Sequence, residues 1–71
     1  KMDANEQAID ILKSYSTSSN AIAIRTQAIE ALGEAGGPKA IDILKSYSTS
    51  SNAIAIRLSA IKALGRAGRI S

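Results

Sequence analysis

Cysteine and histidine are absent from this chain of 71 residues. Their absence excludes disulfide bonds and thiolate metal sites, and it leaves the serine-rich segments without an evident base for nucleophilic catalysis. A chain this short buries a modest fraction of its surface and usually needs a disulfide, a metal or a partner to be stable. We therefore expect a non-enzymatic protein that has no cofactor and relies on packing for its stability.

Phenylalanine, tryptophan and valine are also missing, although 45% of the residues are apolar. The core must therefore consist of isoleucine, leucine and alanine, which suit closely packed helices better than a sheet. No apolar run approaches the roughly 18–20 residues of a membrane span, and no signal segment opens the chain. We expect no membrane partner, and a cytoplasmic location is compatible. The chain begins at Lys1 rather than Met, which suggests a fragment, a processed product or an engineered chain.

The most informative feature is a long segment that occurs twice. AIDILKSYSTSSNAIAIR at 8–25 recurs at 40–57, identical at all 18 positions and offset by 32 residues. The similarity continues more loosely, since TQAIEALGEAG at 26–36 is answered by LSAIKALGRAG at 58–68. A period of about 20–50 residues is typical of repeat proteins, in which each unit buries its apolar face against the next. Identity that extends through the TSSN loop, where packing constrains little, indicates recent duplication or design.

Apolar residues at helical spacing predict two helices in each repeat. The predicted helices span about 4–15, 21–35, 38–47 and 53–67. Helices joined by three or four residues pack as antiparallel hairpins. We therefore expect a single all-α domain over residues 1–71, with repeat 1 at about 4–36 and repeat 2 at about 38–68.

The residues that flank these helices are typical of caps and turns. Asp3 is expected to cap the first helix, and Asn20 or Ser19 the second, because their side chains accept backbone hydrogen bonds. Gly36 is expected to end the second helix in a left-handed conformation, and Pro38 suits the first turn of the third helix.

Apolar side chains lie on two sides of these helices. The main faces, which we expect to cover each other within a hairpin, consist of Ala4, Ala8, Ile11, Leu12 and Tyr15 on the first helix and Ala21, Ile24, Ala28, Ala31, Leu32 and Ala35 on the second. Ile9, Leu12, Ile22 and Ile29 lie to one side, where a lone hairpin would leave them exposed. Fully burying one isoleucine is worth about 1.5–3 kcal/mol, so a second hairpin is expected to stack there. This arrangement is a helical solenoid.

The pattern Ala-Ile-x-x-Leu, a loop, Ile-Arg, then Ala-Ile-x-Ala-Leu-Gly-x-Ala-Gly resembles the HEAT-like repeats of the phycobilisome-lyase type. Designed α-helical repeat proteins have been derived from that same family. The most specific matching residues are Ile24, Arg25, Ala28, Leu32 and Gly33, and their equivalents Ile56, Arg57, Ala60, Leu64 and Gly65. The resemblance implies a short right-handed α-solenoid of two helix-turn-helix repeats, four helices in all, whose second helices line a concave surface. A chromophore-lyase activity finds no attachment chemistry in two repeats without cysteine or histidine.

Arg25 and Arg57 are the residues most suggestive of a ligand site. They lie at the edge of the core face, between the two apolar strips, so we expect a structural role in which they bond loop carbonyls. The family commonly has acidic residues in the loop before its Ile-Arg pair, whereas this chain has Ser-Thr-Ser-Ser-Asn.

Charge is distributed unevenly along the chain. Residues 1–36 carry three basic and five acidic side chains, a net charge of −2, whereas residues 37–71 carry six basic and one acidic, a net charge of +5. A basic half can attract nucleic acid, yet tryptophan and histidine are absent and both tyrosines are expected in the core, so base stacking is poorly provided for. The asymmetry can equally reflect pairing between neighbouring repeats.

The implied solenoid places equivalent residues of opposite charge on adjacent second helices. Glu30 is equivalent to Lys62, and Glu34 to Arg66. We expect charge pairs between the two repeats, each worth about 0–1 kcal/mol when exposed.

The second repeat lacks the polar outer face with which natural solenoids usually finish. It keeps the apolar strip of the first repeat, and Thr26 becomes Leu58, which enlarges that strip. Repeat arrays also generally need about three units to be stable, and this chain has two. The residues expected to mediate self-association are Ile41, Leu44, Ile54, Leu58, Ile61 and Ile70.

A two-fold homodimer that joins like ends is the simplest arrangement of these apolar ends. Head-to-tail stacking, favoured by the charge asymmetry, and domain swapping through the interhelical connections are alternatives. The predicted function is therefore a structural or protein-interaction repeat module that binds itself or another protein, in a natural or a designed chain. Weak nucleic-acid binding through the basic half is the alternative function.

Overall fold

The computed structural model describes residues 4–49 and 52–70, with the side chain of Ile70 excepted. Every regular element in these ranges is an α-helix. The helices are α1 (Ala4–Tyr15), α2 (Ile22–Ala35), α3 (Gly37–Tyr47) and α4 (Ile54–Ile70). The all-α class predicted from the sequence is confirmed, and the helix bounds differ from the expected ones by a few residues.

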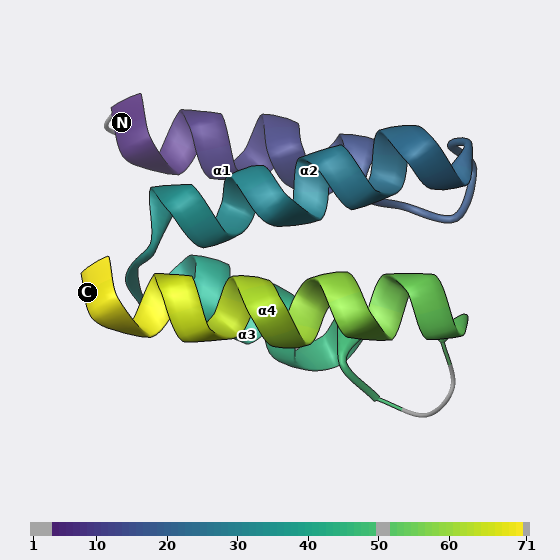
Figure 1. Ribbon diagram of the computed structural model, residues 1–71. Helices are drawn as coiled ribbons and strands as arrows, with labels where there is room; N and C mark the ends of the chain where they lie inside the picture. Colours follow the sequence, from purple (N-terminus) through teal and green to yellow (C-terminus); the bar gives the residue numbers. More distant parts are fainter. Residues whose placement is uncertain (1–3, 50–51, 71) are drawn as a thin grey trace.

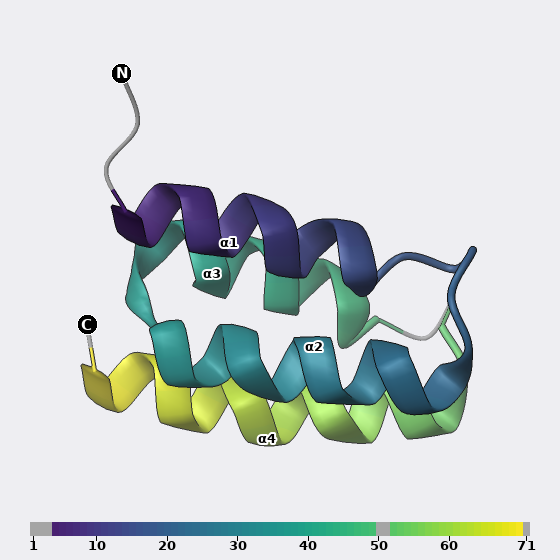
Figure 2. The same ribbon diagram turned by 90° about the horizontal axis from the view of Figure 1, so that it is seen from above.

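The four helices form two antiparallel hairpins that stack on each other (Figure 1). Repeat 1 consists of α1 and α2, and repeat 2 consists of α3 and α4. Seen from above, α1 and α3 form one layer, whereas α2 and α4 lie side by side in the other (Figure 2). The most extensive contact in the molecule joins α2 to α4, so the repeats are held together mainly through their second helices. The fold is a short α-solenoid of two repeats.

The start of α2 differs from the expected one. Its N-cap residue is Ala21, which has no side chain capable of capping, so the predicted cap at Asn20 or Ser19 is wrong. The Asn20 Nδ2 group instead donates a hydrogen bond of 3.1 Å to the carbonyl oxygen of Ser14. This amide therefore fastens the loop to the end of α1. The expected cap at Asp3 lies outside the described residues.

Two glycines make the sharp connection between the repeats. Gly36 has φ 69° and ψ −173°, and Gly37 has φ 86°. Side chains with a Cβ rarely adopt such positive φ values, so this turn requires glycine. The Gly36 N–H closes α2 by bonding the Leu32 carbonyl oxygen at 3.1 Å, and Pro38 follows in the first turn of α3.

The core lies between the two repeats as well as within each. Its buried members are Ile9, Ile29, Leu32, Ala40, Leu44, Ile56, Ala60, Ala63 and Ala67. The expected main face of α1 is wrong, because Ile11 and Tyr15 are exposed and Ile9, from the flanking strip, is buried. Both sides of α1 are apolar, and only the position of repeat 2 decides which of them is covered.

Candidate interaction surfaces

The contact between repeat 1 and repeat 2, here called the junction, buries one side of each repeat. Ile9 and Ile29 are buried on the repeat 1 side, whereas their equivalents in repeat 2, Ile41 and Ile61, are half-buried and exposed. Ile29 is 0% exposed and Ile61 is 53% exposed, although the two are equivalent positions of the repeat and share the neighbours Ala-Ile-x-Ala-Leu-Gly. The difference arises because α4 packs on α2 at the junction, whereas no helix among the described residues packs on the corresponding side of α4.

Repeat 2 contributes a different set of side chains to the junction. Ile56 is 0% exposed, but its equivalent in repeat 1, Ile24, is 48% exposed. Tyr47 is likewise half-buried against the core, whereas Tyr15 is exposed. The side that repeat 2 uses to contact repeat 1 is therefore exposed to solvent in repeat 1. Each repeat has two distinct apolar sides, and each end of the molecule leaves one of them uncovered.

The uncovered sides define two surfaces. The C-terminal end surface consists of Ile54, Leu58, Ile61 and Gly65, which share one stripe of α4. The N-terminal end surface consists of Ile11, Tyr15 and Ile24. Tyr15 and Ile24 also line an apolar hollow of about 500 Å³ at this end, together with Leu12, Ala23, Gln27 and Ala28. The sequence predicted an open surface on repeat 2 and missed the one on repeat 1.

The expected self-association residues are distributed unevenly over the structure. Ile54 is 71% exposed and Leu58 is 62% exposed, so both are available at the C-terminal end surface. Leu44 is fully buried, which corrects its assignment to an open surface, because it packs in the core with the helices around it. Ile41 is half-buried against the same core, and the side chain of Ile70 lies outside the described residues.

Gly33 sets the separation of α2 and α4 at the junction. A Cβ placed on Gly33 would lie 2.8 Å from the Ala63 Cβ and 2.9 Å from the Ala63 Cα. Such a contact is too short for real carbon atoms, so the helices approach each other here only because residue 33 is glycine. A Cβ placed on the equivalent Gly65 meets nothing within 4 Å.

The two arginines singled out from the sequence bond loop carbonyls. Arg25 Nε donates to the Ser16 carbonyl oxygen at 2.9 Å, and Arg57 Nε donates to that of Ser48 at 3.4 Å. Arg25 also stacks over the ring of Tyr47 from repeat 2, with its Cζ 5.9 Å from the ring centroid. These contacts fix the loop of each repeat against the second helix.

A polar contact that the sequence did not reveal crosses the junction beside Arg25. The hydroxyls of Ser16 and Tyr47 form a hydrogen bond of 2.9 Å, and Ser16 is fully buried. Tyr47 is therefore partly covered, as expected, but its hydroxyl bonds to repeat 1. Tyr15, expected in the core, occupies the equivalent position at the open end.

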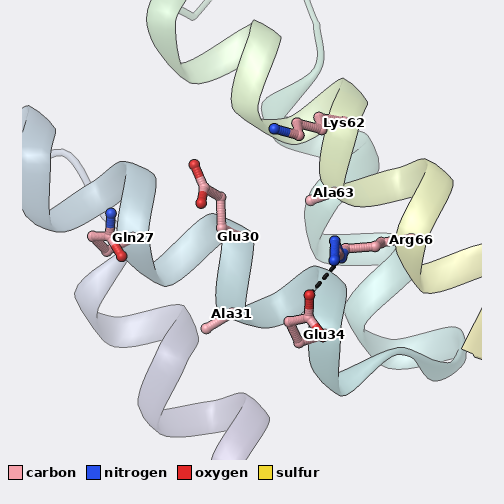
Figure 3. Close-up of a pocket in the computed structure, with 7 residues that line it drawn as sticks. All are labelled: Gln27, Glu30, Ala31, Glu34, Lys62, Ala63 and Arg66. Atoms are coloured by element: carbon pink, nitrogen blue, oxygen red, sulfur yellow. Dashed lines mark ion pairs between the residues drawn. The ribbon is translucent and has the colours of Figure 1, made fainter.

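Charged side chains line a groove of about 300 Å³ between α2 and α4 (Figure 3). The Arg66 guanidinium and the Glu34 carboxylate form an ion pair across it. Glu30 and Lys62 extend toward the same space but form no ion pair with each other. The acidic groups of α2 thus face the basic groups of α4 across the groove, which is not uniformly basic.

A second ion pair joins the repeats through the other layer. Lys39 Nζ lies 2.8 Å from the Asp10 carboxylate, so α3 is linked to α1. The sequence reasoning missed this pair because it considered charges on the second helices alone. The sequence does show a change of charge at this position, since Lys39 of repeat 2 is equivalent to the neutral Gln7 of repeat 1.

The described residues show neither a metal-binding cluster nor a membrane-spanning helix. No group of three or more acidic side chains is placed to hold a metal ion in residues 4–49 and 52–70. Within the same part of the chain, none of the helices has the length and apolar character needed to cross a membrane. The features that stand out are the two apolar ends and the charged groove.

Comparison with known proteins agrees with the repeat architecture. The family described as HEAT repeats matches residues 2–68, nearly the whole chain. The match does not single out the phycobilisome-lyase type. No curated protein and no solved structure matches the sequence. HEAT repeats are in general protein-interaction modules, and the family is typically non-enzymatic. Since this one family accounts for both repeats, the chain belongs to the HEAT-repeat family.

Proposed function

We propose that this protein is a non-enzymatic interaction module that self-associates through its uncovered apolar ends. The observation that carries the proposal is the difference in burial between equivalent residues of the two repeats. Ile61 and Ile24 are each about half exposed at opposite ends, while their equivalents Ile29 and Ile56 are completely buried at the junction. Each end therefore presents an isoleucine whose equivalent is buried at the junction. Ile54 gains less from a neighbour, because its equivalent Ile22 remains 47% exposed beside repeat 2.

The gain from covering these ends comes from apolar burial. Fully burying an isoleucine or leucine side chain is worth about 1.5–3 kcal/mol relative to leaving it exposed. Ile54, Leu58 and Ile61 are more than half exposed on a single helix. Association also costs translational and rotational freedom, so we expect an equilibrium that depends on protein concentration.

Sedimentation velocity over a concentration series tests the proposal. We expect the weight-average mass to rise above the 7.4 kDa of one chain as concentration increases from low micromolar to several hundred micromolar. Circular dichroism on the same samples establishes that the chain is helical. A folded protein that stays monomeric throughout the series would refute self-association.

A matched pair of variants locates the surface responsible. Ile61→Glu places a carboxylate in the C-terminal end surface, and we expect it to abolish or strongly weaken association. Ala55→Glu adds the same charge to α4 at an exposed position whose equivalent, Ala23, is exposed as well, so it lies outside the junction. Equal effects of the two variants would argue that charge, rather than this surface, governs association.

Nucleic-acid binding has less support from the charged groove. Lys62 and Arg66 line it together with Glu30 and Glu34, and Arg66 is already paired with Glu34. Phosphate groups would therefore meet carboxylates beside the cations. Fluorescence anisotropy with a labelled DNA duplex at low salt tests this alternative, and affinity that falls steeply with added salt would support it.

A further inference from the structure

We propose that copies of this chain stack head to tail, with the C-terminal end surface of one copy receiving the N-terminal end surface of the next in the register of the junction. The inference rests on the proposed self-association and specifies its geometry. The physical basis is that the two ends are different and complementary. The C-terminal end surface is made of residues equivalent to those of repeat 1 that contact repeat 2. The N-terminal end surface is made of residues equivalent to those of repeat 2 that contact repeat 1.

Close helix packing is available at such a contact. At the junction, Gly33 of α2 accepts Ala63 of α4 at a separation that no side chain with a Cβ would permit. The same step along the solenoid would bring Ala31 of a second copy against Gly65, whose surroundings are open to at least 4 Å. The free end thus already has the glycine that close approach requires.

The polar contacts of the junction can also form again. Ser16, Arg25 and Tyr47 link the repeats, through a hydroxyl–hydroxyl bond of 2.9 Å and a guanidinium stacked on the ring. Their equivalents at the next step are Ser48, Arg57 and the Tyr15 of a second copy. Arg57 is already held against the Ser48 carbonyl, in the same way as Arg25 is held against that of Ser16. The serine and the arginine of this contact are thus in place at the C-terminal end. The tyrosine would come from a second copy, whose Tyr15 is exposed at the N-terminal end.

Charge favours unlike ends over like ends. The helix α4 carries basic side chains and no acidic one, whereas α2 carries Glu30 and Glu34. Head-to-tail stacking places α4 beside the α2 of the next copy, so Lys62 and Arg66 would again neighbour glutamates. A dimer of two C-terminal ends would place α4 against α4 and bring like charges together. The two-fold dimer expected from the sequence is therefore the less favourable arrangement.

Besides these exchanged charges, two further differences separate the new contact from the junction. Leu58 replaces Thr26 and adds apolar surface, and the N-terminal end offers an apolar hollow of about 500 Å³ to receive it. Gln7 replaces Lys39, so Asp42 would not repeat the ion pair of Asp10. An exposed ion pair is thus exchanged for a buried leucine. Because the two ends differ, stacking either closes into a ring or continues as a filament.

Two half-blocked variants test the geometry. Ile61→Glu blocks the C-terminal end, and Ile24→Glu blocks the N-terminal end at a half-exposed position in the first turn of α2, where an acidic residue suits the helix dipole. We expect each variant alone to sediment as a monomer and an equimolar mixture to form a heterodimer of twice the 7.4 kDa chain mass. Neither variant should form anything larger in the mixture, because each retains one open end.

Each other outcome overturns a particular step. If the Ile24→Glu variant still dimerises alone, the C-terminal ends join each other and head-to-tail stacking is wrong, although self-association stands. If the wild-type chain associates but the mixture does not, the register of the junction is wrong. A monomeric wild-type chain would refute the proposed function itself. The controls Ala55→Glu and Ala21→Glu add the same charge at positions exposed in both repeats, and Tyr15→Glu replaces Ile24→Glu if the latter fails to fold.

Discussion

The two repeats share 18 consecutive identical residues, yet these residues have different environments. Several local hydrogen bonds recur in both copies. Asn20 and Asn52 each donate a hydrogen bond of 3.1 Å to the serine carbonyl six residues earlier, Ser14 or Ser46. Burial is not the same, because Ile24 is 48% exposed and its equivalent Ile56 is fully buried. The comparison shows that short-range hydrogen bonds follow the local sequence, whereas burial follows the neighbour that a solenoid supplies on one side only.

The largest expected difference between the repeats concerns the paired isoleucines of the second helices. Ile29→Ala should destabilise the fold by about 2–5 kcal/mol, because it removes buried methyl groups and leaves a cavity. Ile61→Ala should cost less than about 1 kcal/mol, since half of that side chain is already in water. Urea denaturation of both variants at low protein concentration measures the two values. Equal losses would mean that α4 is covered even in the isolated chain.

The paired glycines should respond with opposite signs. Gly33→Ala forces a Cβ into Ala63, and overpacking of this kind costs about 1–3 kcal/mol, which outweighs the higher helix propensity of alanine. Gly65→Ala meets nothing and should stabilise the monomer by about 0.5–1 kcal/mol. The same Gly65→Ala change should weaken head-to-tail stacking, because it fills the place of close approach. Thermal unfolding reports the first two effects, and sedimentation reports the third.

The equivalent serines Ser16 and Ser48 should differ in how much their hydroxyls contribute to stability. Ser16→Ala removes a buried group that bonds the Lys13 carbonyl at 2.7 Å and the Tyr47 hydroxyl at 2.9 Å. A hydrogen bond of this kind contributes about 0.5–1.5 kcal/mol to stability. Ser48→Ala removes only the local bond to Lys45, so its loss should be smaller. A double-mutant cycle of Ser16→Ala with Tyr47→Phe should show coupling, and independence of the two changes would contradict the contact.

The smallest expected effect belongs to the groove. Glu34→Gln removes the ion pair with Arg66, and because both side chains are at least half exposed, the loss should be at most about 1 kcal/mol and should shrink with added salt. Glu30→Gln is the matched control on the same helix, since Glu30 forms no ion pair with Lys62. Chemical denaturation at low and high salt distinguishes the two. A salt-independent loss for Glu34→Gln would point to a cause other than charge.

The helices and their pairing into repeats could be predicted from the sequence because their signals are local. Apolar spacing, the Gly36–Pro38 turn and the offset of 32 residues each concern residues close together in the chain or an explicit identity between segments. The position of Arg25 beside a loop carbonyl was likewise accessible, because it lies nine residues from its acceptor Ser16.

The inward side of each helix could not be predicted in the same way. Ile9 and Ile11 are both isoleucines on α1, and periodicity alone favoured the wrong one, because apolar residues line two sides of that helix. The contacts of Ser16 with Tyr47 and of Asp10 with Lys39 depend on how the hairpins stack. No feature of the local sequence distinguishes Tyr15, which is exposed, from Tyr47, which is not.

The sequence by itself determined that this protein would form helical hairpins of one repeating kind, because hydrogen bonding and apolar spacing act over a few residues. The tertiary structure decided which copies of those residues are buried, because burial requires a neighbour and the chain supplies one on one side of each repeat. Ile29 lies at the junction and is buried, and its equivalent Ile61 lies at an open end and is exposed. The exposed apolar sides, and with them the capacity proposed for association, follow from which helices pack on each other among the described residues.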